Sequence, residues 1–124
     1  MKTINDLKKA LQTEKDKEIT IAQVQEAREI YKEIAQADFK AKKGWTKTNL
    51  ALVILDKAFM ELMKTEEVKD LRRTIFINEK GSGYNAVLSK EAEEGKHDNV
   101  LSVKFKSERQ IETLIDEYNF YLVA

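Results

Sequence analysis

The segment FKAKKGWTKTN, residues 39–49, places four lysines around the only tryptophan of the chain. A tryptophan beside lysines can stack on a nucleobase, anchor a protein partner or cover the end of its own hydrophobic core. A pair of arginines follows on the C-terminal side of this segment. We therefore predict a partner-binding surface that contains the following residues: Lys40, Lys42, Lys43, Trp45, Lys47, Arg72 and Arg73.

Residues suited to catalysis are few. Cysteine is absent, which excludes disulfides, thiolate nucleophiles, zinc ribbons and iron–sulfur clusters, and His97 is the only histidine. The glycines around Ser82 lack the lysine and the following helix that a P-loop needs, and the acidic segment 90–99 does not have the ligand spacing of an EF-hand. We expect no enzyme, no cofactor and no metal site, although an unfamiliar carboxylate site stays open.

The charges balance, with 22 basic and 22 acidic side chains, but they are unevenly distributed. Residues 1–50 hold 11 basic and 8 acidic side chains, whereas residues 91–124 hold 4 and 8. Net neutrality removes the long-range attraction that phosphate binding uses, while a basic front and an acidic tail suit another protein. A protein partner is the preferred hypothesis, and contact with a nucleic-acid backbone through residues 40–47 is the alternative.

Three amphipathic segments predict helices in the first part of the chain. A short helix is expected over residues 4–13. Thr20 and Gln23 form a capping box that opens a helix near residues 21–43, which should end at Gly44. Thr46 or Thr48 should cap a third helix near residues 49–64, whose apolar composition predicts that it is the most buried. The last two helices should form a hairpin with Trp45 at the bend.

The hydrophobic period changes from 3.6 to 2 near Thr74, which predicts strands in the second part. We expect strands over residues 74–79, 84–89 and 100–106, a turn at 80–83 and an exposed loop at 90–99. Ser107 and Gln110 should cap a helix over 108–119, and residues 120–124 are compatible with a final short strand. The predicted fold class is α+β: one domain over residues 1–124, helical to about residue 72, then a small antiparallel sheet of about three strands packed with the C-terminal helix.

The element order also resembles a winged helix, but the apolar helix near 49–64 offers few polar side chains to the major groove. Nucleic acid would therefore be held through its phosphates. The small size, neutral charge and helix-then-sheet order resemble the accessory or inhibitor proteins of phages and plasmids, including anti-CRISPR proteins. That resemblance implies action through protein–protein contacts. The longest apolar run is far shorter than the roughly 20 residues of a spanning helix, so we expect a cytoplasmic protein without a membrane partner.

Overall fold

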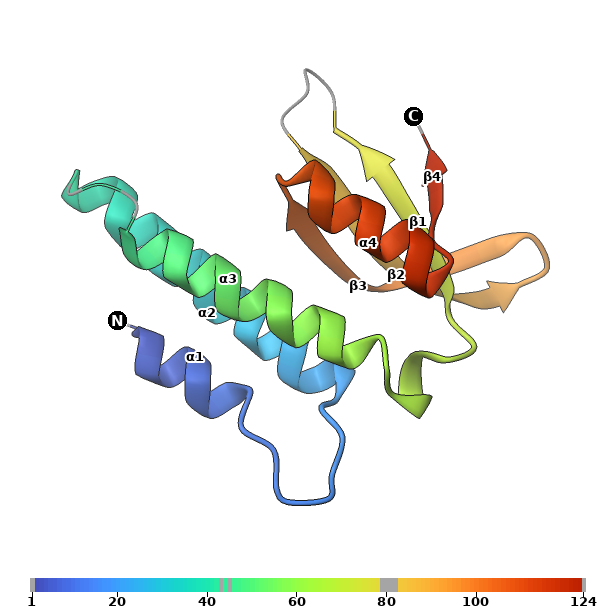
Figure 1. Ribbon diagram of the computed structural model, residues 1–124, viewed down its shortest axis with the longest axis horizontal. Helices are drawn as coiled ribbons and strands as arrows, with labels where there is room; N and C mark the ends of the chain where they lie inside the picture. The colour runs from blue at the N-terminus through green and yellow to red at the C-terminus, as the bar shows by residue number, and fades with distance from the viewer. Residues whose placement is uncertain (1, 43, 45, 79–82, 124) are drawn as a thin grey trace. The chain divides into compact units, whose positions relative to one another are not determined.

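The computed structural model describes residues 2–42, 44, 46–78 and 83–123 (Figure 1). The chain divides into two compact units, Met1–Glu67 and Val68–Ala124. The first unit is helical and the second combines a four-stranded sheet with one helix, so the predicted α+β class is confirmed. The division lies close to the predicted change from helical to mixed structure near residue 72. That the two units act as a single domain stays a prediction.

Gln23 fixes the start of α2 (Ile21–Ala41) and its connection to α1 (Ile4–Ala10). Its backbone N–H donates to Thr20 Oγ1 over 3.2 Å, and its Oε1 accepts from the Thr20 N–H over 3.0 Å. The predicted capping box is therefore confirmed. The Gln23 side-chain amide also donates to the carbonyl of Gln12 over 2.9 Å. This bond joins the start of α2 to the segment that follows α1, which ends at Ala10 and not at the predicted residue 13.

The C-terminus of α2 comes earlier than the sequence predicts. Gly44 was expected to take the left-handed conformation, but Lys42 takes it first, with a φ of 53°. The Lys42 N–H donates to the carbonyl of Asp38 over 3.1 Å. A carbonyl of the last turn of the helix therefore has a hydrogen-bond donor without the help of a glycine. The helix predicted near residues 21–43 is therefore confirmed, with its end at Ala41.

The start of α3 (Thr46–Leu62) is held by a carboxylate from the preceding helix. Asp38 Oδ2 accepts a hydrogen bond from the Thr48 N–H over 2.9 Å and a second from Thr48 Oγ1 over 2.7 Å. Thr48 is therefore a donor inside the first turn of the helix, and the prediction of Thr46 or Thr48 as the cap is wrong. A charged acceptor binds such N–H groups more strongly than a hydroxyl does. The predicted pairing of α2 and α3 as a hairpin is confirmed.

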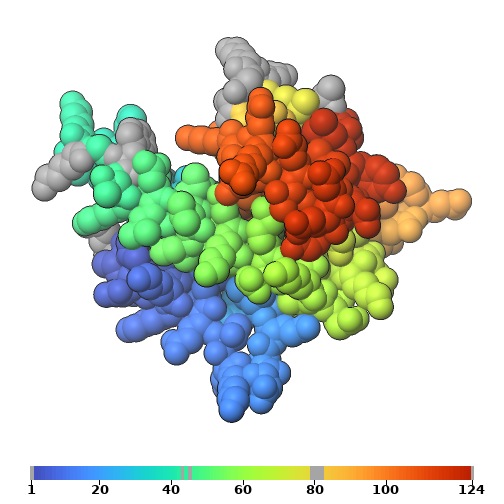
Figure 2. Space-filling model, viewed as in Figure 1, coloured from blue at the N-terminus to red at the C-terminus, as the bar shows by residue number. Residues whose placement is uncertain are grey.

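Helix α3 contributes more buried residues to this unit than α2, as its composition predicts. Phe59 and Leu62 are fully buried. However, Leu50 is 48% exposed and Val53 is 64% exposed, so one side of the helix is not covered. Figure 2 shows α1 and α3, in blue and green, both reaching the surface. The prediction of a buried helix holds for one face of α3 only.

The second unit contains a sheet in the order β3-β2-β1-β4, preceded by the short 3-10 helix η1 (Glu66–Val68). Its strands are β1 (Arg72–Ile77), β2 (Tyr84–Glu93), β3 (Lys96–Phe105) and β4 (Tyr121–Val123). The first three are antiparallel, as predicted, and β4 pairs in parallel with β1. The sheet is therefore mixed and has one strand more than the three that were expected.

The acidic segment 90–99, predicted as a loop, belongs mostly to a long β2–β3 hairpin. Lys90 faces Asp98, and Glu91 faces His97 across the two strands. Glu93 lies opposite Lys96, whose Nζ is 3.7 Å from a Glu93 carboxylate oxygen. Both sides of this part of the hairpin are exposed. The sequence here therefore lacks the alternation of apolar and polar residues that predicts a strand. Pairs of opposite charge favour the ladder in place of hydrophobic burial.

Helix α4 (Glu108–Tyr118) covers one face of the sheet (Figure 1). The side chain of Arg73 lies on this face, because its guanidinium donates to the carbonyl of Tyr118, in α4, over 2.7 Å. Ser107 occupies the N-cap position, but its side chain makes no capping hydrogen bond, so the predicted box with Gln110 is wrong. The pairing register places these buried residues on the face that α4 covers: Ile75, Ala86, Leu88, Leu101, Val103 and Phe105.

The predicted β1–β2 hairpin is confirmed by its strand pairing, while residue 79 of the expected strand and residues 80–82 of the expected turn lie outside the described residues. Gly83 has a φ of +119°, and an added Cβ would lie 2.6 Å from the carbonyl oxygen of Phe105. Gly95 in the β2–β3 turn has a φ of +78°, with nothing within 4 Å of an added Cβ.

We expect Gly83→Ala to destabilise the protein by about 2 kcal/mol or more, because it adds a backbone clash to an unfavourable φ. Gly95→Ala is the matched control and should cost about 1 kcal/mol, since only the left-handed conformation is penalised. Urea unfolding followed by circular dichroism measures both. Equal losses in the two variants would contradict the close approach of Gly83 to β3.

Candidate binding surfaces

The described lysines of the basic segment lie at the bend between α2 and α3. Lys40, Lys42 and Lys47 are all exposed. Lys43 and Trp45 lie outside the described residues, so their roles as contact residues stay predictions. The structure thus places the described part of the segment at the surface, where it is accessible to a partner.

These lysines do not converge on one hollow. Lys47 lines a hollow of about 640 Å³ together with Ile4 and Ile34, with Lys2 as a second cation. Lys40 lines a different hollow of about 500 Å³, which also contains Glu33. Lys40 and Lys47 therefore line two neighbouring hollows, which share Ala37 and Ala41, and do not line one hollow together.

Asp38 places a negative charge in the same region. The hydrogen bond from the Thr48 side chain lowers the pKa of the Asp38 carboxyl, and the Thr48 backbone bond and the charge of Lys47 act in the same direction, while desolvation opposes them. Asp38 is therefore ionised over the whole neutral range. Its charge weakens the attraction of this surface for a phosphate.

The two predicted arginines lie in β1, in the second unit, and their side chains point to opposite faces of the sheet. Arg72 is exposed. Arg73 is partly buried and donates to the carbonyls of Tyr118, over 2.7 Å, and Val68, over 3.4 Å. These bonds give Arg73 a structural role that ties β1 to the end of α4. Its part in partner binding stays a prediction.

The largest group of exposed apolar side chains in the second unit lies where β4 joins β1. All five are between 41% and 70% exposed. We call them the edge cluster: Phe76, Ile77, Tyr121, Leu122 and Val123. Among the described residues, β4 pairs with β1 alone, so its outer edge carries backbone groups without a strand partner. The sequence predicted only a possible short strand here and gave no indication of its place in the sheet.

Sequence reasoning also missed a buried polar neighbourhood in the first unit. Asp56 is 6% exposed and is the only buried carboxylate among the described residues. Burial raises the pKa of the Tyr31 hydroxyl, and the negative charge of Asp56 raises it further. The sequence feature that could have indicated this neighbourhood is Asp56 itself, a single aspartate within the apolar run of α3. Within the described part of the chain, no three His, Cys, Asp or Glu side chains gather in a way that could hold a metal ion.

Comparison with known protein families, with curated proteins and with solved structures finds no significant match to this chain. Of the helices in the described ranges, none has the length and apolar composition needed to cross a bilayer.

We expect Asp38→Ala to lower the melting temperature at pH 7 by about 4–8 °C, because the start of α3 loses its acceptor. The folded pKa of Asp38 lies below its ordinary value of 3.8, so its contribution is present above pH 3.8 and is lost as the pH falls through the lower, folded pKa. Thermal unfolding of the variant and the wild type should therefore converge in acid. Glu33→Ala, on the exposed face of the same helix, is the control, and a pH-independent difference for Asp38→Ala would contradict the assignment.

Proposed function

We propose that this protein is a small non-enzymatic binding module that acts on another protein as an accessory or inhibitor, in the manner of phage and plasmid proteins such as the anti-CRISPR proteins. The observation that supports this proposal is the edge cluster. Five large apolar side chains are exposed around a strand whose outer edge is open. Exposed apolar side chains grouped in this way are typical of protein interaction sites.

The open edge of β4 suits the addition of a strand from a partner. In this mode, an extended segment bonds to the free N–H and C=O groups, and side-chain pockets supply specificity. Proteins that avoid such pairing place lysine or proline on their edge strands. β4 contains Tyr121, Leu122 and Val123, so it has neither, and its short length of three residues is the one protective feature that it has.

The register explains how the edge cluster would contact such a strand. Tyr121 lies opposite Thr74, and Val123 lies opposite Phe76, so these side chains share one face of the sheet. Leu122 lies opposite Ile75 and points to the face that α4 covers. A fifth strand would therefore meet apolar side chains on both faces of the sheet.

The alternative is contact with a nucleic-acid backbone through the basic segment. The exposure of Lys40, Lys42 and Lys47 favours it. However, Lys40 and Lys47 line separate hollows, and the ionised Asp38 lies beside Thr48 in the same region. Net neutrality also removes the general attraction of a basic domain for phosphate. We therefore prefer the protein partner.

We expect Leu122→Lys to abolish capture of a protein partner, because a lysine on the edge strand opposes strand addition. The measurement is an affinity pull-down from the native host after nuclease treatment, repeated over a series of salt concentrations. The exposed position of Leu122 predicts a melting temperature close to that of the wild type, which separates lost binding from lost folding.

The matched control is Lys40→Ala, Lys42→Ala and Lys47→Ala in one chain, which should still capture the partner. The nucleic-acid alternative has the opposite outcome. Binding to duplex DNA would then fall steeply with salt, and the triple lysine variant would flatten that dependence. Partner capture that is unchanged in Leu122→Lys would contradict the role of the edge cluster.

A further inference from the structure

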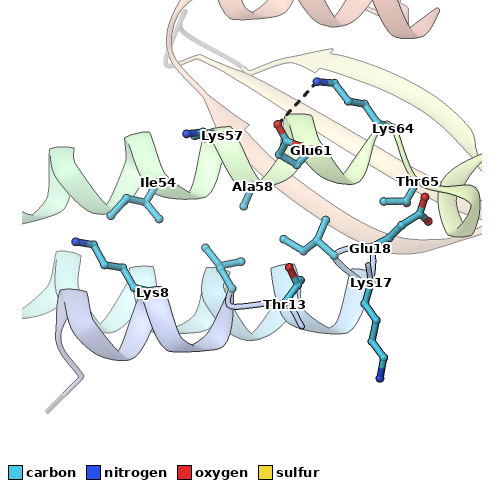
Figure 3. A pocket seen from close by; sticks show the side chains of 12 residues that line it. Lys8, Thr13, Lys17, Glu18, Ile54, Lys57, Ala58, Glu61, Lys64 and Thr65 are labelled. Atoms are coloured by element: carbon cyan, nitrogen blue, oxygen red, sulfur yellow. Dashed lines mark ion pairs between the residues drawn. The ribbon is translucent and has the colours of Figure 1, made fainter. Parts of the chain in front are cut away.

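A groove in the first unit lies between α3 and the segment formed by α1 and the α1–α2 connection. Figure 3 shows Ile54 and Ala58 pointing from α3 toward Lys8 and Thr13 on the facing wall. The groove has a volume of about 590 Å³, which lies within the range of known ligand sites. All its lining residues belong to this one unit. We call it the α1–α3 groove.

The wall supplied by α3 follows one stripe of the helix. The lining positions on α3 run from Ile54 to Glu61 with the spacings of three and four residues that share a helical face, and Lys64 and Thr65 follow the end of the helix. This stripe is about 10 Å long at the helical rise, which is two turns. It continues toward the N-terminus of α3 through Val53 and Leu50, the two exposed apolar residues of the helix. The apolar surface is therefore long and narrow, and its shape matches a helix laid alongside α3.

The charge of the groove is positive. Its lining contains four lysines and two glutamates. Glu61 pairs with Lys64 over 3.8 Å, whereas Glu18 accepts a hydrogen bond from the Glu66 N–H over 3.2 Å and keeps its negative charge. Of the lysines, Lys17 pairs with Glu14 outside the groove.

Two cations of the groove are left without a counter-charge. Lys8 and Lys57 are exposed and form no ion pair within the described part of the chain. Lys8 is on α1 and Lys57 is on α3, so they flank the apolar floor from its two sides. A ligand that fills the floor would place its own polar groups near both ammonium groups.

We propose that the α1–α3 groove binds an acidic amphipathic helix of a protein partner. Apolar side chains spaced along one face of that helix would contact Ile54, Ala58 and Leu11 of the lining, and its flanking carboxylates would pair with Lys8 and Lys57. The proposal names a second surface and a partner class. It does not depend on the edge cluster, which belongs to the other unit.

The test is selection from a display library of helical peptides of about 16 residues, with apolar residues at helical spacing and the remaining positions randomised. We expect enrichment of sequences rich in Asp and Glu. A selected peptide carrying a fluorophore is then titrated with the full chain by fluorescence anisotropy. Lys8→Glu combined with Lys57→Glu should weaken its binding about tenfold or more at low salt, and the difference should shrink as salt is added.

Lys9→Glu is the matched control for Lys8→Glu, because Lys9 is also an exposed lysine in the last turn of α1 but does not line the groove. It should leave peptide binding unchanged. Ile54→Ser tests the apolar floor and should also weaken binding. Leu122→Lys should bind the peptide normally, so failure of this proposal and failure of strand addition at β4 can be told apart.

Several results would overturn the proposal. These are the absence of any enriched peptide, enrichment of neutral or basic peptides, and equal binding by the wild type and the Lys8→Glu, Lys57→Glu variant. Vesicles of anionic phospholipid form a further arm of the experiment. If they bind with the same dependence on Lys8 and Lys57 while no peptide does, the groove serves a lipid surface instead.

Discussion

Helix α3 carries apolar side chains around more of its circumference than α1 and α2 cover, and the form of the first unit follows from this excess. Phe59 and Leu62 are sealed in the core, whereas Leu50 and Val53 on another side of the helix stay in contact with water. Exposed apolar surface forgoes the free energy of burial in proportion to its area, and a contiguous patch of it is typical of an interaction site. The same helix that holds the unit together therefore also supplies one wall of the α1–α3 groove.

The position of α3 depends in turn on a few polar contacts at its ends and along α2. Asp38 joins the end of α2 to the start of α3 through two hydrogen bonds to Thr48. Gln23 joins the start of α2 to the connection after α1. Together these contacts fix which faces of the three helices meet, so the groove between α1 and α3 is a consequence of capping as well as of hydrophobic packing.

The second unit has a comparable excess of apolar surface at the edge of its sheet. β4 is only three residues long, yet it places three large side chains next to Phe76 and Ile77. Arg73, in β1, donates a hydrogen bond to the carbonyl of Tyr118, the last residue of α4. This bond holds the end of α4 next to β1, with which the following strand β4 pairs. Two surfaces of different chemistry thus exist on one small chain: an apolar strand edge and a groove flanked by lysines.

The sequence by itself determined the α+β class, the helical hairpin, the β1–β2 hairpin and the capping box at Thr20, because hydrophobic period and cap residues act over a few neighbouring positions. It missed the Lys90–Asp98 part of the long hairpin, where exposed charge pairs replace apolar alternation. Only the tertiary structure decided that Asp38 caps α3, that β4 joins β1 in parallel, and that Lys8 and Lys57 flank one groove. These features join residues that are distant along the chain, and which distant residues meet is set by packing of whole elements, which local patterns do not encode.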